Sequence, residues 1–289
     1  MWWKGTDKMN VFYVDGEFLP ENEAVISIND IGLLRGYGIF DFLRTYNRRP
    51  FYLDEHVARL ANSARLIDLE LPCSQSEIVD ITMQTLERNA DLDEANIRLV
   101  VTGGVSEDSI TPSNQTRLFV LVTGLHKCPA EWYRDGAAII TTNDERYIPT
   151  AKSTNYIPGI LALSRARQQG AMESIYVDRF GRILEGTTAN IFAFIRKKLV
   201  TPGNSILPGI TREVVLKLVE KQFQVEIRDI HKDEMRLMDE VFITASNKEV
   251  VPVVRMDDRI LSDGKPGERT RWIMQQFADY TREYGLMKK

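Results

Sequence analysis

The chain has 289 residues, of which 43% are hydrophobic and 27% charged, and its formal net charge is −4 at pH 7. This length is enough for one large or two medium domains, and the composition is typical of a globular protein. The charge balance and the lack of long basic runs argue against a nucleic-acid partner. The sequence also lacks the ~18 to 20 consecutive apolar residues of a membrane span and the apolar core of a signal peptide. We therefore expect a cytoplasmic protein with no membrane partner.

Cysteine and histidine are sparse. Cys73 and Cys128 lie far apart without a CxxC spacing, which is typical of free thiols in a reducing compartment. The three histidines are too scattered to predict a metal site. Met9 lies just before the first predicted strand and is an alternative start.

The first half of the chain predicts strands, two helices and two further strands. A hairpin over residues 11–20 turns at Asp15-Gly16. A longer one runs from GIFDFLRTY through a turn at residues 47–50 into FYL. Asp54 is predicted to cap the next helix, and a second helix covers about residues 76–89. The strands NIRLVV and TRLFVLV follow.

The second half alternates strands and helices. Periodicity is lost over residues 124–134, which we interpret as a linker. We therefore predict a smaller N-terminal α+β domain over residues 1–123 and a larger domain over residues 135–289. Two α/β-type domains favour a small-molecule site in the cleft between them.

Lys152 stands in the stretch IPTAKSTNYIPG, between a proline-containing turn and a helix predicted over about residues 160–169. The ordinary interpretation of a single lysine is a solvated loop residue. The alternative is a Schiff-base lysine, whose amine must be neutral to act as a nucleophile. The small neighbours Ala151 and Ser153 leave room for a flat cofactor ring and favour the neutral form by desolvation.

Three further features fit the same chemistry, although each has an ordinary explanation when taken alone. Glu185 ends a strand in GRILEGTTANIFAF and could hold a pyridine nitrogen protonated, but strand-end glutamates are usually surface residues. The helix that opens at LPGIT, with Thr211, offers free N–H groups to a phosphate, or is simply a helix start. Arg59 could bind a phosphate, or lie on a solvated helix face.

Together and in this order, these residues resemble the fold-type IV pyridoxal-phosphate enzymes, the class IV aminotransferases. This family comprises branched-chain aminotransferases, D-amino acid aminotransferases and aminodeoxychorismate lyases. The resemblance covers about residues 10–282, and its most specific part is Lys152 followed by LEGTTANIF, TP and LPGITR. It implies a two-domain α+β / α/β fold of the D-amino acid aminotransferase type, with pyridoxal 5′-phosphate as cofactor and no metal.

The resemblance also implies a role for each matching residue. Lys152 would be the catalytic lysine that forms the Schiff base and moves the substrate proton, Glu185 would pair with the pyridine nitrogen, and Arg59 would hold the phosphate. The other expected cofactor contacts are Tyr156 near the ring hydroxyl, Leu207 under the ring, and Ile210, Thr211, Ser246 and Asn247 around the phosphate. Asn247 departs from the small residue or threonine that is usual in the family, but its amide can still donate a hydrogen bond.

The substrate carboxylate needs an arginine or backbone N–H donors. Arg98, in NIRLVV, falls where the branched-chain branch has an arginine, and Arg35 could reach a neighbouring subunit's site. Tyr37 and Phe40 are further substrate-binding candidates. For each arginine, the ordinary explanation is a structural ion pair.

The sequence features that bear on the stereochemistry of the substrate point in two directions. Residues 102–105 are TGGV, without the arginine and histidine of the usual D-amino acid branch, and Phe40 replaces the family's tyrosine, again nearer the branched-chain branch. However, Lys152 and Asn155 have the shorter spacing of the D-specific enzymes, and the branched-chain FEGIR-like stretch is absent. We favour aliphatic L-amino acids, then D-amino acids.

The lyase and a non-catalytic binding protein are the remaining alternatives. The arginines suit an amino-acid carboxylate without explaining a bulky aromatic substrate, and the joint presence of Lys152, Glu185, Arg59 and Thr211 argues against lost catalysis. We expect a homodimer that transfers an amino group between an amino acid and a 2-oxo acid such as 2-oxoglutarate.

Overall fold

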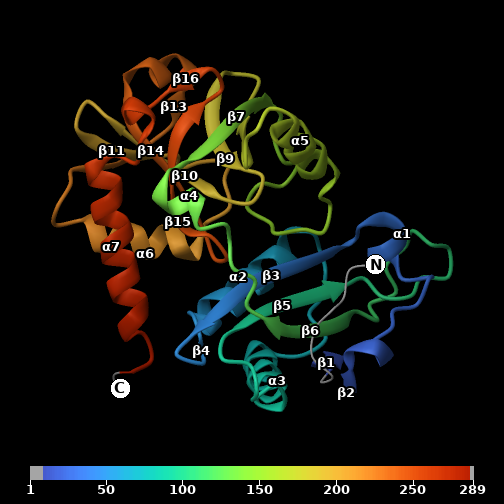
Figure 1. Ribbon diagram of the computed structural model, residues 1–289. Helices are drawn as coiled ribbons and strands as arrows, with labels where there is room; N and C mark the ends of the chain where they lie inside the picture. The colour runs from blue at the N-terminus through green and yellow to red at the C-terminus, as the bar shows by residue number, and fades with distance from the viewer. Residues whose placement is uncertain (1–8, 287–289) are drawn as a thin grey trace. The chain divides into compact units, whose positions relative to one another are not determined.

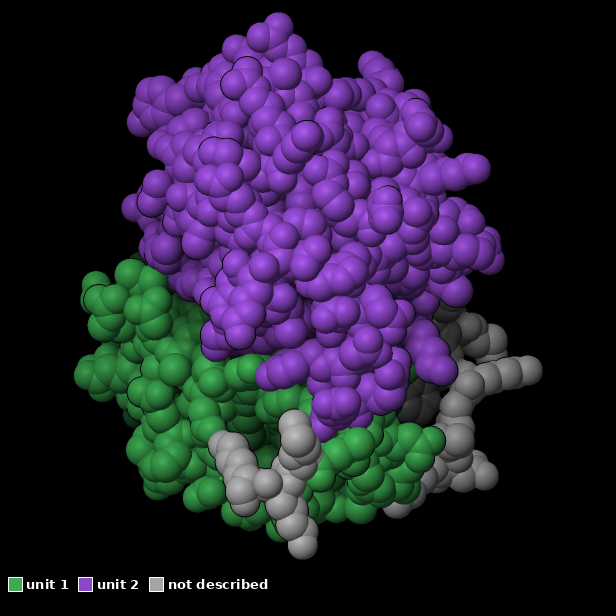
Figure 2. All heavy atoms as spheres, turned by 90° about the vertical axis from the view of Figure 1, so that its left-hand side faces the viewer, with its two compact units in different colours: residues 1–126, 151–155, 284–289 green, residues 127–150, 156–283 purple. Residues whose placement is uncertain are grey.

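The computed structural model describes residues 9–286, and the chain divides into two compact units (Figure 2). Unit 1 holds the chain through His126, the short segment Ala151–Asn155 and the end of the chain from Tyr284. Unit 2 holds Lys127–Thr150 and Tyr156–Glu283. Lys152 therefore belongs to unit 1, although the sequence range in which it lies had been expected to form the larger C-terminal domain.

Unit 1 is a six-stranded antiparallel sheet in the order β2-β1-β6-β5-β3-β4, with helices packed against it (Figure 1). Its strands are β1 (Val11–Val14), β2 (Glu17–Pro20), β3 (Gly38–Tyr46), β4 (Arg49–Pro50), β5 (Ala95–Thr102) and β6 (Arg117–Gly124). Its helices are α1 (Ile31–Arg35), α2 (Leu53–Leu66), α3 (Gln75–Arg88) and the 3₁₀ turn η1 (Glu21–Glu23).

The core of unit 1 forms because alternate residues of its central strands face α2 and α3. Ile97, Leu99 and Val101 on β5 are fully buried, while Arg98 between them is exposed. This alternation is typical of a sheet with one covered face. Ser74 caps α3 with a reciprocal capping box to Glu77, which fixes where that helix begins.

Unit 2 is built on a ten-stranded mixed sheet in the order β12-β11-β10-β14-β15-β7-β8-β9-β13, with β16 paired to β15 (Figure 1). Its strands are β7 (Ala137–Asn143), β8 (Glu173–Val177), β9 (Arg182–Gly186), β10 (Asn190–Ile195), β11 (Lys198–Thr201), β12 (Val225–Ile227), β13 (Ile230–His231), β14 (Met238–Ala245), β15 (Glu249–Met256) and β16 (Arg259–Ile260). Its helices are α4 (Glu131–Arg134), α5 (Ile157–Gln168), α6 (Ile210–Val219) and α7 (Glu268–Glu283), with the 3₁₀ turns η2 (Lys232–Leu237) and η3 (Ser262–Gly264).

The central strands of unit 2 are hydrophobic on both faces because each face is covered. β8 and β10 are buried at every position. Helices α6 and α7 pack against each other, and α7 also packs against β14 and β15, while α5 packs against β7 and β8. Such continuous burial is typical of strands covered on both faces.

Helix α2 begins earlier than the sequence predicts. It starts at Leu53, and the capping residue Tyr52 has a left-handed φ of 53°. The amide N–H of Tyr52 donates to the Tyr284 hydroxyl at 2.9 Å, and the two rings stack. Phe51 and Tyr52 therefore form a turn, so the predicted FYL strand is wrong, and the predicted cap Asp54 lies inside the helix.

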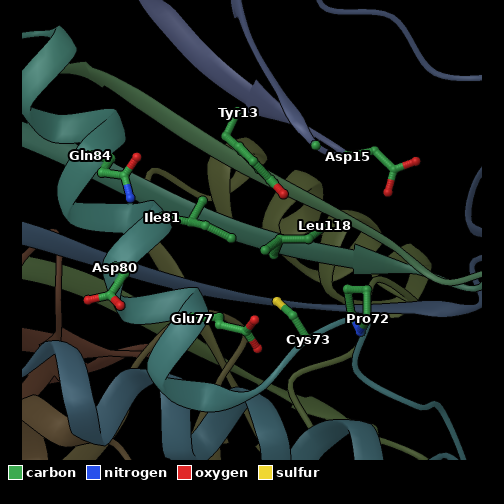
Figure 3. Close-up of a pocket in the computed structure, with 10 residues that line it drawn as sticks. Tyr13, Asp15, Pro72, Cys73, Glu77, Asp80, Ile81, Gln84 and Leu118 are labelled. Carbon is green, nitrogen blue, oxygen red and sulfur yellow. The ribbon is translucent and has the colours of Figure 1, made fainter.

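None of the described helices is long and apolar enough to cross a membrane. A pocket of about 450 Å³ lies in unit 1, between Tyr13 on β1, Leu118 on β6 and Ile81 on α3 (Figure 3). None of the cofactor or substrate residues predicted from the sequence lines it.

Candidate active site

The segment that carries Lys152 is fixed to the start of β3. The backbone N–H of Lys152 donates to the Ser63 hydroxyl at 3.0 Å, and its carbonyl accepts from the Phe40 N–H at 2.9 Å. Ser153 forms a bridge with Ile39, and Ala151 is completely buried. The amine of Lys152 lies 4.6 Å from the centroid of the Phe40 ring. The lysine therefore has a fixed backbone and an aromatic neighbour, unlike a mobile loop residue.

Arg59 is buried on α2, which contradicts the alternative of a solvated helix face. Its side chain makes a two-point contact with Asp41 on β3, with Nε donating to Oδ2 at 2.9 Å and Nη2 to Oδ1 at 2.8 Å. The His56 Nδ1 lies 2.6 Å from the same carboxylate. The Ser63 hydroxyl, which receives the Lys152 N–H, itself donates to the Arg59 carbonyl at 2.9 Å. One face of α2 thus orients both the arginine and the lysine segment.

The charges in this cluster are set by burial and by pairing. Burial alone would raise the pKa of Asp41, but Arg59 and His56 together lower it well below its usual range. Burial lowers the pKa of His56, and the neighbouring cations Arg59 and Lys152 lower it as well. The negative charge of Asp41 opposes this shift. The His56 Nε2 is buried and has no hydrogen-bond partner among residues 9–286. His56 is therefore a neutral imidazole beside an ionised carboxylate.

Glu185 lies near the end of β9 in unit 2, where three groups fix its buried carboxylate. Oε1 forms an ion pair with Arg146 at 2.9 Å. Oε2 accepts the Leu207 N–H at 3.0 Å and lies 3.4 Å from the Asn190 amide nitrogen. The same amide donates to the Leu207 carbonyl at 2.9 Å, so Glu185 binds the N–H of Leu207 and Asn190 binds its carbonyl. The position of this carboxylate is therefore determined before any ligand binds.

Helix α6 begins immediately after this cluster. Gly209 is its N-terminal cap and offers no side chain to the first-turn N–H groups, which include those of Ile210 and Thr211. Both residues are buried. A helix N-terminus with uncapped N–H groups and a threonine hydroxyl is a suitable site for a phosphate.

Gly209 is required by the close approach of Asn190. A Cβ on Gly209 would lie 1.9 Å from the Oδ1 of Asn190, and this buried side chain is fixed because its Nδ2 contacts Glu185 and Leu207. We expect Gly209→Ala to weaken pyridoxal phosphate binding by about 10-fold, because Asn190 and the start of the helix must shift. Absorbance titration of the cofactor-free protein measures this affinity.

Gly124→Ala is the matched control, since its Cβ would meet only Leu92 at an ordinary 3.7 Å. Equal affinities of the two variants for the cofactor would show that the start of α6 does not contribute to phosphate binding.

Tyr156 is the N-terminal cap of α5, and its hydroxyl donates to the Thr187 carbonyl at 2.6 Å. Burial raises the pKa of Tyr156 to about 12; Arg146 opposes this shift, while the negative charges of Glu173 and Glu185 add to it. The phenol therefore stays protonated and acts as a hydrogen-bond donor at physiological pH.

The other predicted contacts are more dispersed. Ser246 and Asn247 form the turn between β14 and β15, and the Asn247 carbonyl accepts the Cys128 thiol at 3.4 Å. Arg35 is exposed at the end of α1, and Arg98 is exposed on β5 with its guanidinium 5.8 Å from the Phe42 ring. The Tyr37 hydroxyl is shared between the carbonyls of Ile67 and Asp68, each at 2.9 Å.

The structure thus brings the predicted residues together in two sets. Within unit 1, Ser63 joins Lys152 to Arg59, and Phe40 bonds to the Lys152 carbonyl. Within unit 2, Asn190 joins Glu185 to Leu207, which lies just before α6. Asp41, His56, Arg146 and Asn190 were not predicted as partners from the sequence. A signal did exist for His56, Arg59 and Ser63, because their i, i+3, i+7 spacing places them on one helix face.

Comparisons with known proteins show the family to which the chain belongs. The model of the family described as amino-transferase class IV matches residues 38–256. A protein of Methanocaldococcus jannaschii, provisionally named branched-chain-amino-acid aminotransferase, is 34% identical over 95% of this chain and 97% of its own. The D-alanine aminotransferase of Staphylococcus aureus is 29% identical over 96% of this chain and 100% of its own.

A solved structure shares the whole fold. A branched-chain amino acid aminotransferase from T.th., complexed with N-(5′-phosphopyridoxyl)-L-glutamate, superposes with a TM-score of 0.87 at 27% identity, covering 95% of each chain. The chain therefore belongs to the class IV aminotransferases, and the fold-type IV architecture with two domains is confirmed.

Class IV aminotransferases depend on pyridoxal phosphate, which is thus the cofactor of this enzyme. The side chains present fit that group. Unit 2 offers a buried carboxylate suited to a protonated ring nitrogen, and an uncapped helix N-terminus suited to a phosphate. Unit 1 offers a lysine amine on a fixed segment.

Proposed function

We propose that this transaminase acts on aliphatic L-amino acids, with a 2-oxo acid such as 2-oxoglutarate as acceptor. The observation that carries the choice of stereochemistry is the packing after β5. A Cβ on Gly103 would lie 2.5 Å from the Tyr37 ring. Gly104 has a φ of +72°, and a Cβ there would lie 1.9 Å from the Gln115 carbonyl oxygen. These two positions leave no room for the arginine or histidine that marks the usual D-amino acid branch.

D-amino acids are the second candidate. The short spacing between Lys152 and Asn155 is that of the D-specific branch, and a D-alanine aminotransferase matches nearly the whole chain.

The L-glutamate adduct of the solved relative belongs to that protein, and it supports the proposal of L-stereochemistry and of 2-oxoglutarate here.

Each residue is assigned a task that suits its surroundings. Bound pyridoxal phosphate supplies an electron sink for amino-group transfer. Lys152 would hold it covalently and would accept the α-proton of the substrate. Glu185 pairs with the ring nitrogen, and Tyr156, still protonated, donates a hydrogen bond. Arg59, Ile210, Thr211, Ser246 and Asn247 bind the phosphate.

Arg98 is assigned to the substrate carboxylate, with Arg35, Tyr37 and Phe40 as further substrate contacts. The homodimer and the cytoplasmic location expected from the sequence stay predictions.

The test is a half-reaction. The purified enzyme is loaded with pyridoxal phosphate and titrated separately with L-leucine and D-alanine, and the absorption band of the lysine-bound cofactor is followed. We expect L-leucine to bleach the band and D-alanine to leave it. Bleaching by D-alanine alone would replace the first candidate with the second, and a band that neither compound bleaches would contradict both.

A further inference from the structure

The carboxylate of Glu173, at the start of β8, is completely buried and accepts hydrogen bonds from two neighbouring threonines. Oε1 accepts the Thr187 hydroxyl at 2.5 Å and the Thr187 N–H at 3.2 Å. Oε2 accepts the Thr188 hydroxyl at 2.5 Å. The Ser174 N–H donates to Oε1 at 3.0 Å. Because all these groups donate, the carboxylate acts as an acceptor throughout.

Lys248 supplies the counter-charge. Its amine lies 3.3 Å from the Glu173 Oε2 and contacts the Thr188 hydroxyl, and its side chain is only 11% exposed. A buried carboxylate without a cation beside it would be strongly destabilised. Lys248 is also the residue that follows Ser246 and Asn247, and its carbonyl accepts the Tyr133 hydroxyl at 3.0 Å.

Two loops that carry or adjoin predicted cofactor contacts therefore meet at this ion pair. The loop of residues 187–189 joins β9, which carries Glu185, to Asn190 at the start of β10, and its Thr187 carbonyl receives the Tyr156 hydroxyl at 2.6 Å. The turn of residues 246–248 joins β14 to β15. Gly186 makes the close approach possible, since a Cβ there would lie 3.0 Å from the Glu173 side chain.

We propose that Lys248 is a positioning residue of this transaminase: by neutralising Glu173 it fixes the Thr187–Thr188 loop and, through the Thr187 carbonyl, the hydroxyl of Tyr156. This inference rests on the proposed function, because it gives Tyr156 a task at the cofactor. Lys248 itself does not touch the reacting atoms. Its removal should reduce turnover more than it reduces affinity for the amino donor.

The first measurement uses the cofactor-free protein. Hydrogen exchange is followed by mass spectrometry for peptides that cover residues 186–189. In Lys248→Met we expect exchange of this loop to accelerate at least ~10-fold, because the Thr187 and Thr188 bonds to Glu173 loosen. Lys248→Arg keeps the charge and should restore most of the protection.

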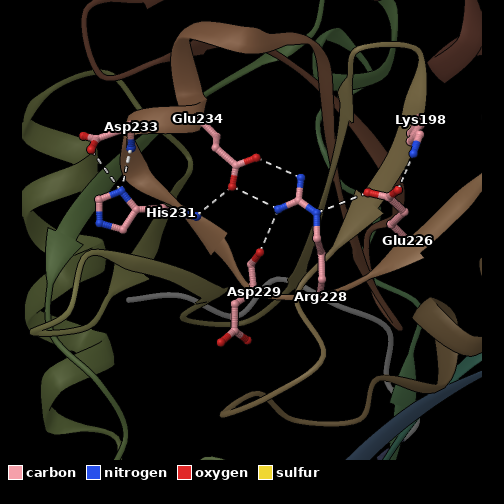
Figure 4. A network of polar contacts seen from close by, with 7 residues as sticks. All are labelled: Lys198, Glu226, Arg228, Asp229, His231, Asp233 and Glu234. Carbon is pink, nitrogen blue, oxygen red and sulfur yellow. Dashed lines mark hydrogen bonds and ion pairs between the residues drawn. The ribbon is translucent and has the colours of Figure 1, made fainter.

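Lys198→Met is the matched control. Lys198 also pairs with a glutamate of unit 2, Glu226, at 2.6 Å, but in a partly exposed network (Figure 4). We expect this variant to leave both the loop exchange and the turnover unchanged. Unchanged loop exchange in Lys248→Met as well would overturn the positioning role.

The second measurement uses the loaded enzyme. We expect Lys248→Met to lower kcat about 10-fold with KM for the amino donor nearly unchanged, and to add little to Tyr156→Phe in the double variant. If the fold-losses in kcat of the two single variants multiplied in the double variant, Lys248 would not act through Tyr156. That result would overturn the inference. Lys248→Met/Glu173→Gln, which removes both charges, replaces the single variant if that one does not fold.

The two proposals fail in different ways. A wild-type protein that forms no cofactor band and transfers no amino group would remove the proposed function. The loop exchange in the cofactor-free protein would still decide whether Lys248 fixes the loop.

Discussion

Lys152→Ala is expected to lower turnover by on the order of 10³-fold or more, and to abolish the absorption band of the lysine-bound cofactor. Both losses would have one cause, since we propose that the same amine attaches the cofactor and moves the substrate proton. The fold should survive, because the backbone of residue 152 keeps its bonds to Ser63 and Phe40. Stopped-flow absorbance after mixing with L-leucine measures the step directly.

Two controls separate this chemistry from a loss of structure. Lys198→Ala removes an exposed lysine of unit 2 and should retain the band and the rate. Addition of a small amine such as methylamine should restore part of the Lys152→Ala rate, because a free amine can accept the proton that the side chain normally takes. A Lys152→Ala protein with a wild-type band would assign the Schiff base to another lysine.

The sequence predicts those parts of the site that are local in the chain. Lys152 and its small neighbours, Glu185 near the end of a strand, and the glycine before Thr211 each occupy a short stretch with its own signature. The same holds for the strands of unit 1, where alternating burial follows the alternating side chains. In these cases the physical cause lies within a few residues.

The rest depends on contacts between distant residues. Glu173 and Lys248 are separated by 75 positions, and nothing near either one indicates the other. Helix α2 begins at Leu53 because the preceding Tyr52 bonds to Tyr284, 232 positions away. Such contacts follow from the tertiary fold, which overrides local propensity and capping signals.

The orientation of Arg59 is set by the tertiary fold, through a partner that the sequence did not indicate. The sequence indicates an arginine suited to phosphate, but the buried Asp41 that orients it lies on a different element. A two-point contact fixes the plane of the guanidinium, so its orientation does not depend on the phosphate that we propose it binds. Asp41 is thus predicted to affect both the stability of unit 1 and the affinity for the cofactor.

Asp41→Asn is expected to lower the free energy of unfolding by about 3 to 5 kcal/mol at pH 7, since it leaves Arg59 buried without its counter-charge. The pH dependence follows from the lowered pKa of Asp41. Stabilisation by this group is fully present above its unfolded pKa of about 4 and is lost as the pH falls towards its folded value. Urea denaturation should therefore show a gap between wild type and variant that is constant near neutrality and narrows in acid.

Glu226→Gln is the matched control for the loss of unfolding free energy expected in Asp41→Asn. Glu226 also pairs with an arginine, Arg228 at 3.2 Å, but both side chains are about a third exposed, so we expect a much smaller loss. Asp41→Asn should also weaken pyridoxal phosphate binding, which Glu226→Gln should not. If both variants lost equally little stability, water would have to reach Arg59 in Asp41→Asn. The buried contact with Asp41 would then not be what fixes the guanidinium.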